Sequence, residues 1–348
     1  MSPLRIAVAG AGLIGRTHIE LVSRSPELQL GAVVDPAPAG AQLAVQRGVP
    51  HFESLQALLA QQRPDGLILA TPNALHVPQA LQCLAAGVSV LVEKPVSTTV
   101  AEGQALLRAE QSCAARVLVG HHRAHSPLMA QAAELARSGR LGRIVAVMGS
   151  AAFHKPTQYF ADGPWRTQIG GGPILINMIH EVHNLRMLCG EIVAVQAFAS
   201  NAVRGFVVED TVSINLRFAS GALGSFLLSD TAACARSWEQ TSQENPAYPS
   251  YGDEDCYVLT GTLGSLSVPT MRLKTYADAQ EASWWKPFSE DRLAVQREDP
   301  LARQLAHFAQ VLRGQAQPLV SVRDGLQNLR VTEAIAEAAR SGGVVTLN

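Results

Sequence analysis

Three consecutive residues, Glu93-Lys94-Pro95, follow the short apolar run 88–92, which is typical of a buried strand. Polar groups at the carboxyl end of such a strand lie where open α/β sheets bind their ligands. A lysine in that place can serve proton chemistry, because burial shifts the pKa of its amine readily. Taken alone, the tripeptide fits equally a turn that closes a strand.

A glycine-rich loop lies near the start of the chain, between a predicted strand at 4–9 and a predicted helix at 13–24. Its residues Gly10-Ala11-Gly12-Leu13-Ile14-Gly15 have the spacing of a dinucleotide-binding turn. The first glycine allows the tight turn, the second lets the backbone approach a pyrophosphate, and the third permits close helix–strand packing. The helix, which begins at Leu13 and Ile14, offers free N–H groups and a favourable dipole to phosphates.

An acidic residue, Asp35, ends the second predicted strand, twenty residues after Gly15. Its carboxylate can accept a hydrogen bond from a ribose 2′-OH and would repel a 2′-phosphate. Pro36 and Ala37 follow, so no cation is offered to NADP there. We therefore favour NAD over NADP as the cofactor. FAD is a weaker rival for the same pattern, and a tight turn without a ligand is the structural alternative.

Polar residues also follow the next predicted strand, at 67–70. Thr71-Pro72-Asn73 closes it, and His76 comes shortly after. Thr71 and Asn73 are candidate cofactor contacts, since Asn73 can hydrogen-bond a ribose or the nicotinamide. An ordinary helix cap is the alternative for Asn73, because asparagine is favoured there. His76 is a third candidate, with a capping or core histidine as the alternative.

The last two strands of this half end in the same way. Glu93 can accept from ribose hydroxyls, and Lys94 can donate to a substrate oxygen. The run 120–123, Gly-His-His-Arg, closes the final strand, so His122 and Arg123 join the candidate substrate contacts. Because the carboxyl ends of parallel strands share one edge of a sheet, these loops converge, which favours a catalytic cleft.

The first third of the chain alternates between strands and helices, which indicates right-handed βαβ units and a doubly wound parallel sheet. The predicted strands are 4–9, 30–34, 67–70, 88–92 and 116–119, and the predicted helices are 13–24, 54–61, 77–86 and 100–114.

After about Gly120 the pattern changes to consecutive strands, which indicates a large, mainly antiparallel sheet. The predicted strands are 143–153, 193–200, 208–218, 222–229, 256–260 and 265–268, the predicted helices are 127–137, 174–189, 301–313 and 322–339, and 235–255 is a predicted loop. We expect a Rossmann domain at 1–122 that binds NAD(P). A substrate-binding and oligomerisation domain at 123–348 should follow, and its terminal helices can pack back on the first.

Composition excludes several classes of protein. The chain has 348 residues, 47% of them hydrophobic, and a net charge of −1 without a basic tail. Nucleic acid is therefore not an expected partner. No apolar run reaches the ~20 residues that a membrane span needs, and no signal peptide is apparent. Five scattered cysteines fit reduced thiols, so we expect a cytoplasmic location.

Histidines in the second half are the other candidates for chemistry. His180, His183 and Asn184 share one face of a predicted helix. His180 can take or give the proton that accompanies hydride transfer, since its ordinary pKa lies near neutrality. A buried structural histidine is the alternative. With His121, His122, His125 and His154 these two histidines form a conceivable zinc site, but no acid or cysteine has ligand spacing, so we expect no metal.

Basic side chains offer anchors for a substrate carboxylate. Arg123, Lys155 and Arg166 are the candidates, because arginine grips carboxylates bidentately and lysine pairs with them as a point charge. Trp165 can wall the pocket. Surface charges and a core aromatic are the alternatives. Arg166, beside Trp165 and just before a glycine run, is the preferred substrate contact.

These motifs together resemble the Gfo/Idh/MocA family of sugar and polyol oxidoreductases. The matching segments are Gly10–Gly15, Thr71–Asn73, Glu93–Pro95, Gly120, Trp165-Arg166, Gly170–Gly172, His180 and Gly261–Ser265, so the resemblance covers essentially the whole chain. It implies a Rossmann domain followed by an α/β domain with a large open sheet. In such proteins that sheet often joins subunits, so a homodimer or homotetramer is expected.

The resemblance also implies catalytic roles. The family's catalytic lysine matches Lys94 and its catalytic histidine matches His180. Many members carry aspartates where this chain has Ile176 and His183, so the usual Asp–His–Asp arrangement is missing. Asn177 neighbours the first missing acid and is a candidate substrate contact, as is His183. Some enzymes of the branch that this pattern resembles act on cyclic cis-diols of aromatic acids.

We therefore predict an NAD(P)-dependent oxidoreductase. It interconverts a secondary alcohol and a ketone on a sugar, polyol or cyclic diol, and a cis-dihydrodiol that bears a carboxylate is among the expected substrates. The alternative is a dinucleotide-binding sensor or regulator without turnover, which the isoleucine at 176 favours and the retained Lys94 and His180 oppose.

Overall fold

The computed structural model describes residues 2–347. Its contacts divide the chain into two compact units. The first comprises the residues up to 125 together with 300–329, and the second comprises 126–299 together with the residues from 330 onward. Helix α11 (Val322–Ser341) begins in the first unit and ends in the second.

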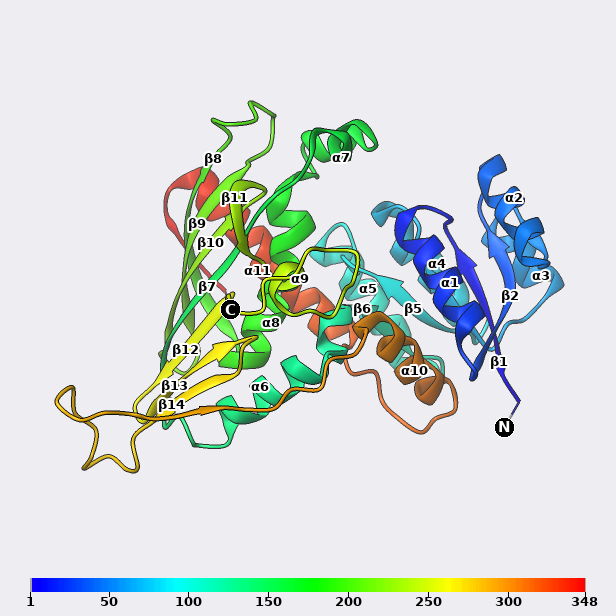
Figure 1. The fold of residues 1–348 in the computed structure, drawn as a ribbon. Coiled ribbons are helices and arrows are strands. Elements are labelled where there is room, and N and C mark those ends of the chain that lie inside the picture. The colour runs from blue at the N-terminus through cyan, green and yellow to red at the C-terminus, as the bar shows by residue number, and fades with distance from the viewer. Residues whose placement is uncertain (1, 348) are drawn as a thin grey trace. The chain divides into compact units, whose positions relative to one another are not determined.

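The first unit is built on a six-stranded sheet in which every neighbouring pair is parallel (Figure 1). Its strands are β1 (Leu4–Ala9), β2 (Leu28–Val34), β3 (His51–Phe52), β4 (Gly66–Leu69), β5 (Ser89–Glu93) and β6 (Val117–Gly120). They lie in the order β3-β2-β1-β4-β5-β6, which is the order of a dinucleotide-binding Rossmann sheet. The predicted doubly wound parallel sheet is confirmed.

Helices connect these strands and cover the sheet. They are α1 (Leu13–Arg24), α2 (Pro38–Arg47), α3 (Leu55–Gln61), α4 (Asn73–Ala85), α5 (Val100–Gln111) and, from late in the chain, α10 (Pro300–Leu312). Helix α10 packs beside α1, and its Phe308 lies in the core formed around Ile68 and Leu91. A Cβ on Gly66 of β4 would lie 2.6 Å from Leu312, so the lack of a side chain there lets α10 approach the sheet.

The second unit is built on a larger, mixed sheet. Its strands are β7 (Ile144–His154), β8 (Ile192–Ser200), β9 (Thr211–Phe218), β10 (Leu223–Ser229), β11 (Thr231–Arg236), β12 (Tyr257–Gly261), β13 (Gly264–Val268), β14 (Arg272–Thr275), β15 (Ser289–Arg292) and β16 (Val344–Thr346). The order is β15-β14-β13-β12-β7-β10-β9-β8-β16, with β11 beside β7. All pairs are antiparallel except β7 with β10. The prediction of a mainly antiparallel sheet is confirmed.

Helices pack on one face of this sheet and leave the other face open. The helices of this unit are α6 (Pro127–Arg137), α7 (Thr157–Ala161), α8 (Ile179–Cys189) and α9 (Trp238–Thr241), with the end of α11. Strand β9 shows the consequence, since its residues are alternately buried and exposed. The buried set packs with α6, α8 and α11 in one core, as expected for a sheet covered on a single side.

Several predicted elements were wrong in detail. The predicted helix 174–189 begins with a π-helical turn, η3 (Ile174–Met178), and becomes α-helical only at α8. The predicted loop 235–255 contains the end of β11 and all of α9. Helix α2 and the two-residue strand β3 were missed. In α2 the Pro and Gly are typical of a turn, although Pro is also favoured in the first turn of a helix.

No helix within residues 2–347 is both long enough and apolar enough to cross a membrane.

Packing of α10 on the first sheet generates a prediction. Phe308 is fully buried, so Phe308→Ala should cost about 3–5 kcal/mol of stability through lost contacts and a residual cavity. Amide hydrogen exchange should accelerate in β1 and β4. Val45→Ala on α2, where the side chain is 79% exposed, is the matched control and should leave exchange unchanged. Unchanged exchange in the Phe308 variant would contradict this packing.

Candidate active site

The glycine turn joins β1 to α1 in a geometry that allows no side chain at two of its three glycines. Gly10 has a φ of +92°, and a Cβ on it would lie 2.3 Å from the carbonyl oxygen of Ala70. A Cβ on Gly15 would lie 1.9 Å from the carbonyl oxygen of Gly10. These contacts fix the start of α1 against the end of β1.

Gly12 differs from the other two glycines of the motif in having free space around it. A Cβ on it would meet no heavy atom within 4 Å, and its φ of −72° is open to any residue. The start of α1 has no side-chain cap, and the side chain of Leu13 there is 80% exposed. Space above Gly12 and uncapped N–H groups from Leu13 and Ile14 onward are what a pyrophosphate needs, so the turn fits a dinucleotide.

Asp35 follows β2 and is bonded to this turn. One carboxylate oxygen accepts the N–H of Ala11 at 2.7 Å, and the other accepts the N–H of Ala37 at 2.8 Å. A Cβ on Gly40 would lie 2.4 Å from the Asp35 side chain, so the first turn of α2 also presses on it. Each carboxylate oxygen has a second lone pair, so Asp35 is held in place and can still accept from ribose hydroxyls.

His76 on α4 links two of the loops predicted to hold the cofactor. Its Nδ1 lies 2.8 Å from the carbonyl of Pro95, and its Nε2 lies 2.9 Å from the carbonyl of Thr71. The pKa of His76 is lowered overall. Burial is the largest influence and lowers it, whereas the contacts with the Pro95 and Thr71 carbonyls raise it. Both ring nitrogens face backbone carbonyls, so His76 joins the loop after β4 to the loop after β5. Asn73 is half-buried in the first turn of α4.

Glu93 points into the first unit, toward α1. Its Oε1 lies 2.8 Å from Nε2 of His18, whose ring is fully buried, and its Oε2 accepts the N–H of Lys94 at 3.2 Å. Nδ1 of His18 has no partner among the described residues, so Nε2 is the nitrogen that carries the proton to Glu93. His18 therefore connects helix α1 to Glu93, the residue that precedes Lys94.

The pKa of Glu93 is lowered overall. Burial is the largest influence and raises it, but the hydrogen bond from His18, with the charges of His18, Lys94 and His122, outweighs burial. Glu93 is thus a buried carboxylate held in its charged form by its neighbours. Gly120 at the end of β6 pairs with Glu93, and a Cβ there would lie 3.0 Å from the Glu93 backbone.

The other candidates of the first unit follow the same strand ends. Lys94 is half-buried directly after β5, and the Lys94–Pro95 peptide bond is cis. His122 and Arg123 begin the 3-10 turn η1 (His122–His125) after β6, where His122 is half-buried and Arg123 is buried. The structure therefore gathers the predicted residues of this unit at the carboxyl ends of β1, β2, β4, β5 and β6.

In the second unit, a buried tyrosine fixes the orientation of α8. Tyr257 on β12 donates its hydroxyl proton to Glu181 and accepts from Nδ2 of Asn184 at 2.9 Å. Asn184 thus serves the core, although the sequence grouped it with the histidines. His180 and His183 lie on the same helix and are both buried, with 8% and 7% of their surfaces exposed.

The segment before α8 contains the aromatic and arginine candidates. Arg166 lies in the 3-10 turn η2 (Pro164–Thr167) and donates from Nη1 to the carbonyl of Tyr159. Its guanidinium carbon stands 3.9 Å from the centre of the Tyr159 ring and 5.7 Å from that of Trp165. Trp165 is 52% exposed, so it is a surface aromatic beside Arg166.

Asn177, in the π turn, is bonded to a lysine that sequence reasoning had treated as a separate anchor. The ammonium of Lys155 donates to Oδ1 of Asn177 at 2.6 Å and lies 3.4 Å from Asp230. Arg204 pairs with the other oxygen of Asp230 at 2.8 Å. The π turn is also held at its start, because Glu209 accepts the N–H of Ile174 at 2.8 Å.

Residues that support the site and that sequence reasoning missed include His18, Tyr257 and Asp230. Asp230 carried a usable signal, because it directly follows strand β10, whose last two residues are buried. His18 and Tyr257 gave none, since both occupy positions on apolar faces where a core residue is expected.

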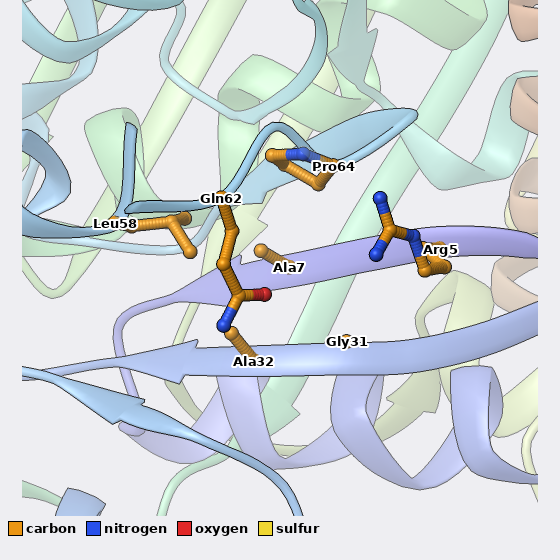
Figure 2. A pocket seen from close by; sticks show the side chains of 7 residues that line it. All are labelled: Arg5, Ala7, Gly31, Ala32, Leu58, Gln62 and Pro64. Atoms are coloured by element: carbon orange, nitrogen blue, oxygen red, sulfur yellow. The ribbon is translucent and has the colours of Figure 1, made fainter. Parts of the chain in front are cut away.

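A small cavity lies elsewhere in the first unit (Figure 2). It is lined by Arg5 and Ala7 of β1, Gly31 and Ala32 of β2, and Leu58, Gln62 and Pro64 from α3 and the loop after it. Its volume of about 40 Å³ holds a water molecule or two, not a dinucleotide. Within residues 2–347 no three His, Cys, Asp or Glu side chains gather as a metal site would require.

A Rossmann sheet, a glycine turn open above its second glycine and an acid after β2 define a dinucleotide-dependent enzyme. Comparison with known families agrees. Residues 4–121 match the model described as an oxidoreductase family with an NAD-binding Rossmann fold, and residues 129–267 match the GFO/IDH/MocA C-terminal domain. The chain belongs to the Gfo/Idh/MocA family, as the resemblance implied, and it is an oxidoreductase.

Curated relatives and solved structures extend over the whole chain. The 1,5-anhydro-D-fructose reductase of Ensifer adhaerens is 26% identical, over 95% of this chain and 96% of its own length. The scyllo-inositol 2-dehydrogenase (NAD(+)) of Bacillus subtilis is 25% identical, over 99% and 96%. The WlbA dehydrogenase of Bordetella pertussis, solved with NADH and UDP-GlcNAcA, has a TM-score of 0.79 at 26% identity, over 100% and 99%.

The glycine geometry generates a paired prediction. Gly15→Ala should destabilise the fold by about 1–3 kcal/mol, because its Cβ would clash with the Gly10 carbonyl. Gly12→Ala should leave stability unchanged and weaken NADH binding about tenfold or more, since the methyl group would occupy space above the turn. Thermal unfolding and NADH fluorescence titration separate the two effects. An unchanged NADH affinity in Gly12→Ala would contradict the placement of the pyrophosphate.

The His18–Glu93 pair predicts a pH-dependent loss of stability. Because the pKa of Glu93 is lowered in the fold, its stabilising contribution is present above the ordinary glutamate pKa and is lost as the pH falls through the folded value. His18→Leu should cost about 3 kcal/mol near neutral pH, since it leaves a buried carboxylate without its donor. At about pH 3, below the ordinary glutamate pKa, the cost should shrink.

Urea unfolding at the two pH values measures this effect. His18→Asn, which retains an N–H donor, is the matched control and should recover part of the loss. A loss of the same size at both pH values would show that His18 contributes only packing.

Proposed function

We propose that the chain is an NAD-dependent dehydrogenase that interconverts a secondary alcohol and a ketone on a sugar, polyol or cyclic diol, including diols that carry a carboxylate. The cradle formed by the glycine turn and Asp35, beside the strand that ends in Glu93 and Lys94, carries this proposal. The names of the relatives support the substrate class, since they include a reductase of an anhydro sugar and inositol dehydrogenases.

NAD is favoured over NADP because Asp35 holds its carboxylate at the end of β2 and no cation follows it in Pro36 and Ala37. The turn and Asp35 would hold NAD+, which would supply the hydride acceptor for the alcohol carbon. Gly10, Gly12 and Gly15 shape the turn for the pyrophosphate, and Asp35 receives the ribose hydroxyls. Thr71, Asn73 and Glu93 are the proposed cofactor contacts from the surrounding loops, and His76 holds two of these loops together.

Lys94 hydrogen-bonds the reacting oxygen and stabilises its developing negative charge, and His180 takes up or returns the proton. His122, Arg123, Trp165, Arg166, Asn177 and His183 are the proposed substrate contacts. The first unit, close to the predicted 1–122, would bind the cofactor. The second unit, within the predicted 123–348, would bind the substrate and join subunits.

A homodimer or homotetramer through the large sheet is part of the proposal. The face of that sheet that bears no helices exposes apolar side chains on three strands, namely Met148, Phe198, Leu223 and Leu227. Exposed apolar residues in such a group mark interaction surfaces. We also propose a cytoplasmic location, since burial raises the pKa of Cys83 and Cys189 to about 12 and keeps both as unreactive thiols.

Activity assays test the proposal. Following NADH formation with a panel of polyols, sugars and cyclic diols should reveal turnover of at least one class. Lys94→Ala should lower kcat by about 10²–10⁴-fold while NADH still binds, because the lysine acts on the reacting oxygen. Lys286→Ala, at a half-exposed lysine of the second unit, is the control and should leave turnover unchanged.

Near-normal turnover by Lys94→Ala would overturn the role of the lysine. Tight NADH binding by the wild type without turnover of any compound would favour the sensor instead.

A further inference from the structure

The contact between Lys155 and Asn177 fixes which atom of the Asn177 carboxamide faces the lysine. An ammonium group only donates hydrogen bonds, so the atom of the Asn177 carboxamide that faces it must be the oxygen. The amide nitrogen, Nδ2, then points away from Lys155. Asn177 is half-buried, and its Nδ2 has no partner in the part of the chain that the structure describes. The π turn therefore presents a donor whose orientation is fixed by Lys155.

Lys155 can impose this orientation because it is itself held at both ends. Its backbone N–H donates to the carbonyl of Asp230 at 2.8 Å, and its carbonyl accepts from Arg204 at 2.9 Å. Its ammonium lies 3.4 Å from the Asp230 carboxylate and 4.9 Å from the centre of the Tyr159 ring. Asp230 is 1% exposed, so this pairing is shielded from solvent.

A second cation lies on the same tyrosine. The guanidinium of Arg166 stacks on Tyr159, and the structure gives its buried Nε no partner among the described residues. The guanidinium of Arg166 and the Nδ2 of Asn177 are therefore both hydrogen-bond donors. Neither side chain is acidic, so neither would repel an anionic substrate group. A carboxylate accepts such donors and has none of its own to satisfy.

We propose that Lys155 and Asp230 are positioning residues for Asn177, and that Asn177 donates through Nδ2 to a carboxylate of the substrate. This inference rests on the proposed dehydrogenase function and narrows it to substrates that carry an anionic carboxylate. An aspartate at the same position would bond Lys155 through one oxygen and turn its other oxygen, a negative acceptor, toward the substrate. It would repel a carboxylate and favour a hydroxyl.

Matched substrate pairs test the proposal. The probes are D-glucuronate with D-glucose, and cyclic cis-diols with and without a carboxylate, each assayed by NADH formation. The readout is the ratio of kcat/KM for the carboxylated member to kcat/KM for its neutral partner. The wild type should favour the carboxylated member, and Asn177→Asp should lower the ratio by about ten- to hundredfold, mainly through KM.

Asn245→Asp is the matched control. It makes the same chemical change at an exposed residue of the same unit, where Oδ1 accepts the N–H of Ala247 and a carboxylate can do the same. The ratio should stay at the wild-type value.

A double-mutant cycle tests the positioning role. Lys155→Met should lower the ratio because it frees the carboxamide to rotate, and Lys155→Arg, which retains a donor, should recover part of it. In an Asn177→Leu background, Lys155→Met should lower the ratio no further. If Lys155→Met does not fold, the Asn177 variants decide the matter, since their side chain is only half-buried.

Two outcomes separate this inference from the proposed function. Turnover with a ratio that Asn177→Asp leaves unchanged, or a wild type that favours the neutral members, would overturn the inference alone. Absence of turnover with every member of the panel would overturn the proposed function and this inference with it.

Discussion

Close packing inside the first βα turn is the constraint on which the rest of the cofactor site depends. Gly15 packs against the carbonyl of Gly10, and Gly10 packs against the carbonyl of Ala70, so neither glycine can carry a side chain and the start of α1 is fixed. His18 lies one turn further along that helix and reaches Glu93 at the end of β5. The position of Lys94 is therefore linked to the same helix whose N-terminus fits the pyrophosphate.

In the second unit, the candidate side chains are held in position by different interactions. There the candidate residues His180 and His183 lie on one helix, so the rotation of α8 about its own axis decides which side chains face the same side. Tyr257 fixes that rotation by bonding Glu181 and Asn184 from the sheet below. Glu209 and Lys155 hold the π turn that precedes α8. π turns are frequent at functional sites, where they re-aim a side chain within a helix.

Local sequence patterns were sufficient for the fold class and for the residues at strand ends. Glycine spacing and the acid after β2 depend on short-range geometry, so the sequence alone predicts Gly12 and Asp35 as cofactor candidates. Partners across the fold were not found, because His18 and Glu93 are separated by 75 positions and Lys155 and Asn177 by 22. A π turn is equally hidden, since its residues have ordinary helical preferences and tertiary contacts such as that of Glu209 stabilise it.

Two positions near His180, Ile176 and His183, lack the aspartates that many family members carry, and this bears on how the proton chemistry is divided. From Ile174 through Cys189 the chain has a single carboxylate, Glu181, and the hydroxyl of Tyr257 donates to it. An aspartate at 176 or 183 would supply a carboxylate charge beside His180, and the isoleucine and histidine at these positions do not. On the proposed function, the burden of stabilising and protonating the reacting oxygen moves toward Lys94, whose neighbour Glu93 is kept charged by His18. The second unit is then left to recognise the substrate, and a donor at Asn177 suits that role better than an acid would.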